Sequence, residues 1–114
     1  MTLITQIEDR GAVVAWCPLS SHADFVALGL KDSGGGGFDT TSYGSELEFY
    51  NLNITTNDDD DKPKLLGSIK TTSRFASIGW CSSSNAQKYP MGFVAGGMED
   101  GVVHIWDPNA ILSG

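Results

Sequence analysis

The chain has 114 residues, the size of one small domain, and 40% of them are hydrophobic and 10% aromatic. Fourteen Asp and Glu against seven Lys and Arg give a net charge of −7, which argues against a protein that binds the phosphate backbone of nucleic acids. No stretch approaches the about 20 apolar residues of a membrane span, and three Trp, three Tyr and five Phe exclude a wholly disordered chain.

The first ten residues have the pattern of neither a secretory signal nor a transit segment, so the sequence predicts a cytosolic protein. In that compartment the two cysteines are expected to be reduced, and the Asn53-Ile54-Thr55 sequon is interpreted as chance.

Short apolar or alternating runs bounded by Gly, Ser, Asp and Pro predict an all-β fold. One helical turn is expected, over Asn109–Leu112. The predicted strands are Leu3–Ile7, Val13–Trp16, Phe25–Gly29, Leu47–Asn51, Leu65–Ile69, Phe75–Trp80, Gly92–Gly96 and Val102–Trp106.

These strands form two repeated units with the same order of elements. Because side chains alternate along a strand, Val103 and Ile105 should point to the same face of their own unit as Leu47 and Phe49 do in theirs. The matched segments are Ala15–Cys17 with Gly79–Cys81 (64 positions later), Phe25–Gly29 with Phe93–Gly97 (68 later) and Glu46–Asn51 with Val102–Asp107 (56 later).

The second unit has the pattern of a WD repeat over residues 97–107, in which Trp106-Asp107 closes the third strand. Asp100-Gly101 predicts a tight hairpin turn with both residues at positive φ. The first unit is degenerate, because Tyr50-Asn51 stands where Trp-Asp is expected. It also contains two insertions, expected to be flexible surface loops: residues 31–45 with the run Gly34–Gly37, and residues 55–64 with the run Asp58–Asp61.

A WD blade takes about 40–45 residues and a closed propeller has about 4–8 blades, so this length supplies two blades at most. The sequence therefore predicts a partial WD-repeat β-propeller. Its expected parts are an outer closing strand at 1–8, a degenerate first blade at 9–70 and an incomplete second blade at 71–114.

The whole chain resembles the amino-terminal segment of the larger outer-cage subunit of the COPII vesicle coat. The stretches that carry the resemblance are Ala15–Pro18, Ala27–Gly29, Phe38–Ser42, Ser45–Phe49, Ser73–Phe75, Val94–Gly97 and Ile105–Gly114. Two features extend the resemblance beyond an ordinary WD blade: the insertion after Gly29, and the ending in which Asp-Pro is followed by a short apolar Ile-Leu and Gly.

The resemblance implies a non-catalytic coat scaffold at endoplasmic reticulum exit sites and on vesicles travelling to the Golgi. In that family a seven-bladed propeller precedes an insertion blade, a helical solenoid and a proline-rich segment. The subunit pairs with a smaller propeller protein, contacts the inner coat and its small GTPase, and forms cage vertices through its propellers. Of these functions, the two early blades could hold only the vertex contacts. The alternative is a WD propeller of another scaffold or adaptor, such as a ubiquitin-ligase substrate receptor.

No catalytic, cofactor-binding or metal-binding residue is predicted. Cys17 and Cys81 occupy equivalent repeat positions and lack the ligand count of a metal site. His22 and His104 belong to no nucleophile–His–acid pattern.

Neither of the two low-complexity runs predicts a ligand site. Gly34–Gly37 is not followed by the Lys and helix of a phosphate loop, and Asp58–Asp61 lacks the ligand spacing of a calcium loop. The three tryptophans, Trp16, Trp80 and Trp106, are expected in the core.

Two blades alone would leave sheet faces without a neighbour and Val102–Trp106 as an unpaired edge. The isolated chain is therefore expected to oligomerise, aggregate or be partly disordered.

Overall fold

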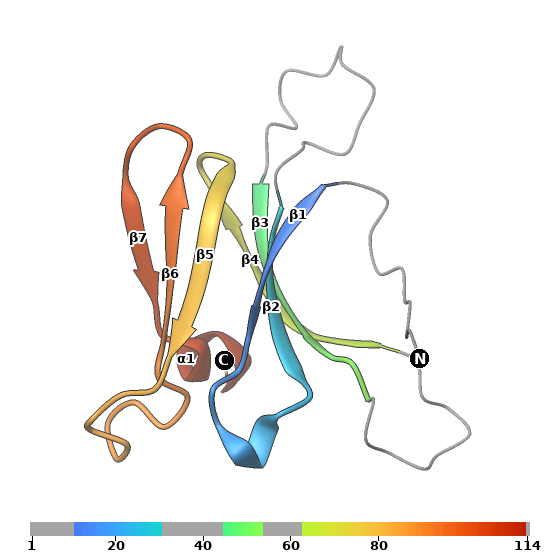
Figure 1. The fold of residues 1–114 in the computed structure, drawn as a ribbon, viewed down its shortest axis with the longest axis vertical. Helices are drawn as coiled ribbons and strands as arrows, with labels where there is room; N and C mark the ends of the chain where they lie inside the picture. Colours follow the sequence, from blue (N-terminus) through green and yellow to red (C-terminus); the bar gives the residue numbers. More distant parts are fainter. Residues whose placement is uncertain (1–10, 31–44, 54–62, 114) are drawn as a thin grey trace.

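The structure is a computed structural model that describes residues 11–30, 45–53 and 63–113. Over these residues it is mainly β-strands with one short α-helix, as Figure 1 shows, so the predicted all-β fold is confirmed. The predicted strand Leu3–Ile7 lies outside the described residues. The elements are β1 (Ala12–Trp16), the 3-10 turn η1 (Ser20–His22), β2 (Phe25–Leu30), β3 (Ser45–Asn51), β4 (Lys64–Thr71), β5 (Phe75–Cys81), β6 (Phe93–Met98), β7 (Val103–Trp106) and α1 (Pro108–Ser113).

The strands form two antiparallel sheets that lie side by side (Figure 1). Sheet A has the order β1-β2-β3-β4, and sheet B has the order β5-β6-β7. In both sheets each strand pairs with the next strand in the chain, which is the arrangement of a propeller blade. The fold is therefore compatible with a partial WD propeller. Within the described residues β7 is an edge strand, as the sequence predicts.

Most strand boundaries differ from the sequence prediction by one or two residues. β3 begins at Ser45 and β4 at Lys64, because backbone pairing continues to the Ser45–Thr71 and Asn51–Lys64 pairs. The last residue of each predicted insertion therefore belongs to a strand. β6 begins one residue later than predicted, because Gly92 has a φ of 70° and the Cys81 carbonyl leaves no room for a Cβ there.

The hairpin between β6 and β7 also differs from its predicted form. Gly101 has a φ of 87°, but Asp100 does not have a positive φ, so the prediction for Asp100 is wrong. The loop is longer than a two-residue turn. The Met98 N–H donates to the Val102 carbonyl at 2.9 Å, and this hydrogen bond encloses the three residues between them. The Asp100 carboxylate accepts the Val102 N–H at 3.1 Å and holds the turn.

The main core lies between the two sheets, at what we call the A–B interface. Phe49 of β3 and Trp80 of β5 meet edge-on, with ring centroids 5.4 Å apart and planes at 78°. The Trp80 indole N–H donates to the Met91 carbonyl at 2.7 Å, which fixes the ring. Buried residues of both sheets complete this core: Ala27, Leu47, Phe49, Phe75, Val94 and Met98.

α1 links the end of sheet B to the outer strand of sheet A. Pro108 opens the helix, where its missing N–H costs nothing, and the Asp107 carboxylate accepts the Asn109 N–H at 3.1 Å. At the other end Leu112 packs over Gly67 of β4. The predicted helical turn is confirmed and extends over six residues.

The two units use corresponding faces, as the repeat predicts. Leu47 and Phe49 point toward sheet B and are fully buried. Val103 and Ile105 alternate with Trp106, which packs into the A–B interface, so they point away from sheet A and are 66% and 67% exposed. Each pair thus lies on the face that its sheet would turn toward a following blade.

Trp16 is not in the core, so that prediction is wrong for this residue. It alternates in β1 with Ala15, which is buried, and lies on the face of sheet A directed away from sheet B, where it is 55% exposed. Trp80 and Trp106 pack partly against the main core.

Candidate functional site

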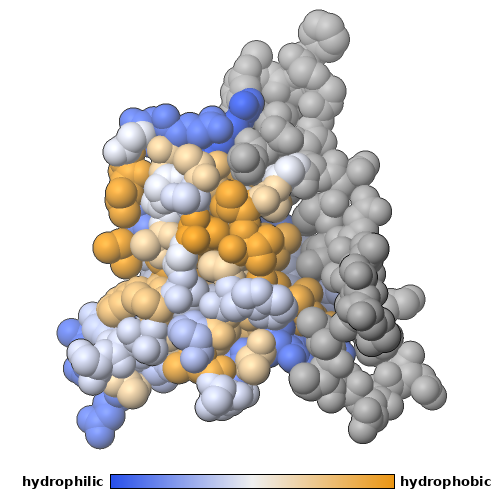
Figure 2. Space-filling view, in the orientation of Figure 1, coloured by the Kyte–Doolittle hydropathy of each residue, from blue (hydrophilic) through white to orange (hydrophobic). Residues whose placement is uncertain are grey.

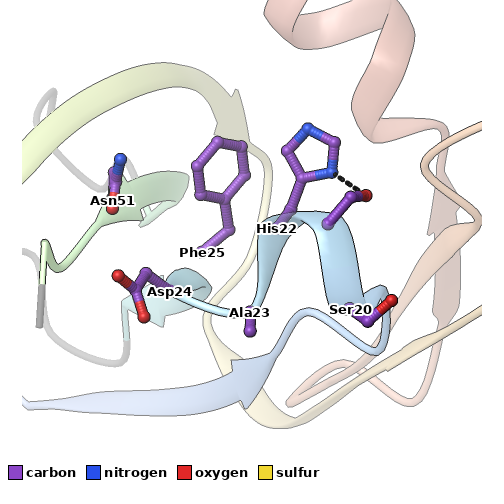
Figure 3. Close-up of a pocket in the computed structure, with 7 residues that line it drawn as sticks. Ser20, His22, Ala23, Asp24, Phe25 and Asn51 are labelled. Atoms are coloured by element: carbon purple, nitrogen blue, oxygen red, sulfur yellow. Dashed lines mark hydrogen bonds between the residues drawn. The ribbon is translucent and has the colours of Figure 1, made fainter. Parts of the chain in front are cut away.

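A small polar pocket lies at one end of sheet A, beside η1 (Figure 3). Its cavity is about 200 Å³, which is below the range usual for small-molecule sites. The lining residues come from the β1–β2 connection and the end of β3: Ser20, Ser21, His22, Ala23, Asp24, Phe25 and Asn51.

The side chains of this pocket do not form a catalytic relay. Ser21 Oγ lies 2.8 Å from His22 Nδ1, and the imidazole packs on Phe25 with centroids 4.8 Å apart. Figure 3 shows Phe25 between His22 and Asn51, with the Asp24 carboxylate pointing away from the imidazole. Among the residues that line this pocket, no acid therefore orients His22 in the manner of a hydrolase.

His104 lies elsewhere, in β7, where its ring stacks on Trp106 at 5.5 Å and 14°. The structure therefore does not bring the two histidines into one pattern. Across residues 11–30, 45–53 and 63–113, no group of three or more His, Cys, Asp and Glu could hold a metal ion. The runs Gly34–Gly37 and Asp58–Asp61 lie outside the described residues.

The equivalent cysteines Cys17 and Cys81 are both free thiols in different environments. Cys17 is buried, and desolvation raises the pKa of its thiol, opposed by a weaker hydrogen bond with the Leu19 backbone. Cys81 is exposed. The difference fits the fold, because sheet B packs on the face of sheet A that includes Ala15, whereas no described element packs on the corresponding face of sheet B.

A second cavity, of about 400 Å³, lies where the β4–β5 connection meets the β6–β7 hairpin. The Glu99 N–H donates to the Arg74 carbonyl at 2.9 Å and joins the two loops. Arg74 lines the cavity together with Glu99 and Asp100. Because the lining carries both positive and negative side chains, it does not favour a ligand of either charge.

Within the described residues, no element packs on the face of sheet B that points away from sheet A. We call it the outer face of sheet B. It combines exposed branched side chains on β7 with small residues on β5 and β6, and Figure 2 shows hydrophobic surface on this side of the molecule. The strand register places these residues on it, with Phe93 at the end of β6: Ser77, Gly79, Cys81, Phe93, Ala95, Gly97, Val103 and Ile105.

The sequence predicted this face in general terms, because the repeat leaves one side of the second unit without a neighbour. It did not predict the η1 pocket. The polar Ser20-Ser21-His22 run was the only local signal, and its 3-10 turn depends on the His22 N–H donating to the Leu19 carbonyl.

No protein-family model matches the chain. Curated proteins do match it over most of its length. It is 32% identical over 105 residues to "Protein transport protein SEC31" of Dictyostelium discoideum, which is 91% of this chain and 7% of that protein. The chain is homologous to Sec31. The family resemblance inferred from the sequence is thereby confirmed.

Two further Sec31 proteins show the same extent of similarity. The protein of Schizosaccharomyces pombe is 35% identical over 103 residues, 90% of this chain and 8% of the relative. Sec31 homolog B of Arabidopsis thaliana is 31% identical over 105 residues, 90% of this chain and 9% of the relative. The chain thus spans less than a tenth of the length of these relatives. None of the helices within the described residues is long and apolar enough to cross a membrane.

Proposed function

We propose that this chain is a structural segment of a COPII outer coat, acting as a scaffold in vesicle budding from the endoplasmic reticulum toward the Golgi. The observation that carries the proposal is the match to Sec31 proteins over about nine tenths of the chain. The fold supports it, because two successive antiparallel sheets have the order and pairing of propeller blades. The adaptor alternative is not favoured, since the relatives described above are protein transport proteins.

In this proposal residues 9–70 form the first blade and residues 71–114 form the second, of a ring of seven. Residues 1–8 supply an outer strand that closes the ring. The contacts available to this segment are those between propellers at cage vertices. The smaller outer-cage protein and the inner coat are partners of the longer assembly, on the cytoplasmic side of exit-site membranes.

We further propose that the chain is not an enzyme. The η1 pocket supports this, because its histidine has a serine beside it, no acid of the described lining orients it, and the pocket volume is small.

A chimera tests the proposed function. The 105 residues of Dictyostelium discoideum Sec31 that align with this chain would be replaced by the aligned part of this chain in cells lacking the native copy. We expect the chimera to concentrate at exit sites and to sustain secretion. A matched chimera with Phe49→Asp should fail, because a charge would be buried at the A–B interface.

Failure of the unmodified chimera, with the chimeric protein stable and at normal abundance, would contradict the proposal. The isolated 114-residue chain should itself collect poorly at exit sites, because it offers at most the propeller contacts. Accumulation equal to that of the chimera would show that the recruiting surface lies within these residues.

A further inference from the structure

The cavity of about 400 Å³ between the β4–β5 connection and the β6–β7 hairpin lies at one end of sheet B (Figure 1). Its volume is within the range of about 300–1,000 Å³ that is usual for ligand sites. Thr72, Glu99 and Asp100 are exposed, so the cavity is open at the surface. Blades of a propeller pack through their sheet faces, and loops at the strand ends stay on the rim of a closed ring. The cavity therefore does not depend on which sheet faces are covered.

The backbone around this cavity is held in place by contacts within the chain. Phe75, directly after Arg74, is fully buried in the main core. The Arg74 carbonyl accepts the Glu99 N–H at 2.9 Å, and the Thr71 Oγ1 donates to the Ser73 carbonyl at 2.9 Å. The lining side chains thus extend from a fixed frame, which lowers the entropy cost of binding a ligand.

Two neighbouring hydrogen-bond donors of the lining are unused. Ser73 Oγ is buried and has no hydrogen-bond partner among the described residues. The Arg74 side chain is partly buried and forms no ion pair with another described residue, although Glu99 and Asp100 line the same cavity. Buried polar groups in folded proteins are nearly always paired, and a guanidinium binds carboxylates well. This side of the cavity therefore favours an acidic group of a ligand.

The opposite side of the cavity carries carboxylates. Asp100 accepts the Val102 N–H at 3.1 Å with one oxygen, and Glu99 uses only its backbone N–H in the contact between the loops. Two carboxylates repel a simple anion such as phosphate, and no group of three or more metal-ligating side chains occurs within the described residues. The lining thus matches a ligand that presents an acidic and a basic group together.

We propose that this cavity binds a segment of another protein in which an acidic and a basic side chain lie close together. Arg74 binds the carboxylate of that segment, and Ser73 donates to it after its side chain turns about χ1. Glu99 binds the ammonium or guanidinium group, and Asp100 adds to the negative charge around it. A cavity that is open at the surface lets a longer chain cross it. This inference rests on the two loops and does not depend on the proposed coat function.

Binding of short peptides to the purified Dictyostelium discoideum Sec31 chimera tests the site. Capped peptides would be immobilised on a biosensor surface: Gly-Glu-Gly-Lys-Gly, the same peptide with Glu and Lys exchanged, Gly-Lys-Gly-Lys-Gly and Gly-Gln-Gly-Gln-Gly. We expect the better of the two Glu/Lys peptides to bind about tenfold more tightly than the Gln peptide, because both of its charges are matched. It should also bind more tightly than the Lys/Lys peptide.

Variants of the chimera separate a binding role of Arg74 from a structural one. Arg74→Glu makes every charge of the lining negative, so it should weaken the Glu/Lys peptide by about tenfold and strengthen the Lys/Lys peptide. Unfolding cannot produce that gain. Ser73→Ala should cause a smaller loss. Lys88→Glu is the matched control, because it makes the same change of charge at an exposed site in the β5–β6 connection, at the other end of sheet B, and it should bind like the unmodified chimera.

Four outcomes would overturn the proposal. The first is equal binding of the Glu/Lys and Gln peptides, and the second is an Arg74→Glu variant whose peptide preference is unchanged. The third is an equal loss in Lys88→Glu, which would show that only the overall charge matters. The fourth is Arg74-dependent binding to phosphatidylserine vesicles without any peptide preference, which would show that the site takes an anionic membrane surface instead.

Discussion

The face of sheet A that meets sheet B and the outer face of sheet B have matching sequence patterns but opposite exposure. Leu47 and Phe49 are fully buried, whereas the equivalent Val103 and Ile105 are about two thirds exposed. The equivalent alanines and cysteines show the same contrast: Ala27 and Cys17 are buried, and Ala95 and Cys81 are exposed.

The difference teaches that the pattern within a strand specifies which side chains share a face, but not whether that face is covered. Coverage depends on a neighbouring sheet. Sheet B supplies Phe75 and Trp80 to the inner face of sheet A, and no described element does the same for the outer face of sheet B. The comparison can be sharpened by paired substitutions on the two faces.

The largest expected effect separates Phe49 from Ile105. Phe49→Ala should lower the free energy of unfolding by about 3–5 kcal/mol, because it removes a ring from the closed core. Ile105→Ala should change it by less than about 0.5 kcal/mol, because the side chain is mostly in water. Urea unfolding followed by tryptophan fluorescence measures both. Equal costs would show that the outer face is covered in solution.

A smaller effect is expected at the glycines of the two faces. A Cβ at Gly29 would overlap the Phe75 ring, so Gly29→Ala should cost about 1–3 kcal/mol through overpacking. Gly79→Ala is the matched control on the outer face. It meets open space and should be neutral or stabilise the strand by up to about 1 kcal/mol. A loss of stability at Gly79 comparable to that at Gly29 would contradict the assignment of the two faces.

A third effect is expected in the β6–β7 hairpin, where a substitution should change stability through the backbone conformation and not through burial of a sheet face. Gly101 has a φ of 87°, so Gly101→Ala should cost about 1–2 kcal/mol, measured by the same unfolding experiment. Glu99→Ala in the same turn is the control and should be nearly neutral, since Glu99 is exposed and uses its backbone N–H for the contact to Arg74. An unchanged stability for Gly101→Ala would show that the turn adopts another form.

The smallest effect concerns the pH dependence of the two thiols. Burial raises the pKa of Cys17, so the unfolded chain loses this proton first. The stability that Cys17 contributes is therefore fully present below the ordinary thiol pKa of about 8.5 and is lost as the pH rises through the higher folded value. Cys17→Ser should flatten the alkaline limb of a stability–pH curve. An unchanged limb would contradict burial of Cys17.

Much of the fold was predictable from the sequence because it depends on local patterns. Alternation and turn residues placed every described strand to within a few residues, and the repeat placed Val103 and Ile105 on the correct face. The errors occurred where a neighbour decides the outcome. Pairing with β4 extends β3 to Ser45, and no described element packs on the face of β1 that holds Trp16.

The candidate sites were less predictable than the fold. The η1 pocket depends on loop backbone contacts, such as the Leu52 N–H donating to the Asp24 carbonyl, that leave no periodic trace in the sequence. The position of Asp100 depends on a three-residue loop, and the Asp-Gly pair alone does not distinguish this from a two-residue turn.

The most direct test of the comparison is the labelling of Cys81 by a maleimide in the Dictyostelium discoideum Sec31 chimera, against the isolated 114-residue chain. If these residues are two successive blades of a propeller, the following blade of the chimera covers the outer face of sheet B. Cys81 should then react as slowly as buried Cys17, whereas in the isolated chain it should react freely. A Cys81 thiol that reacts equally fast in both proteins would contradict the account.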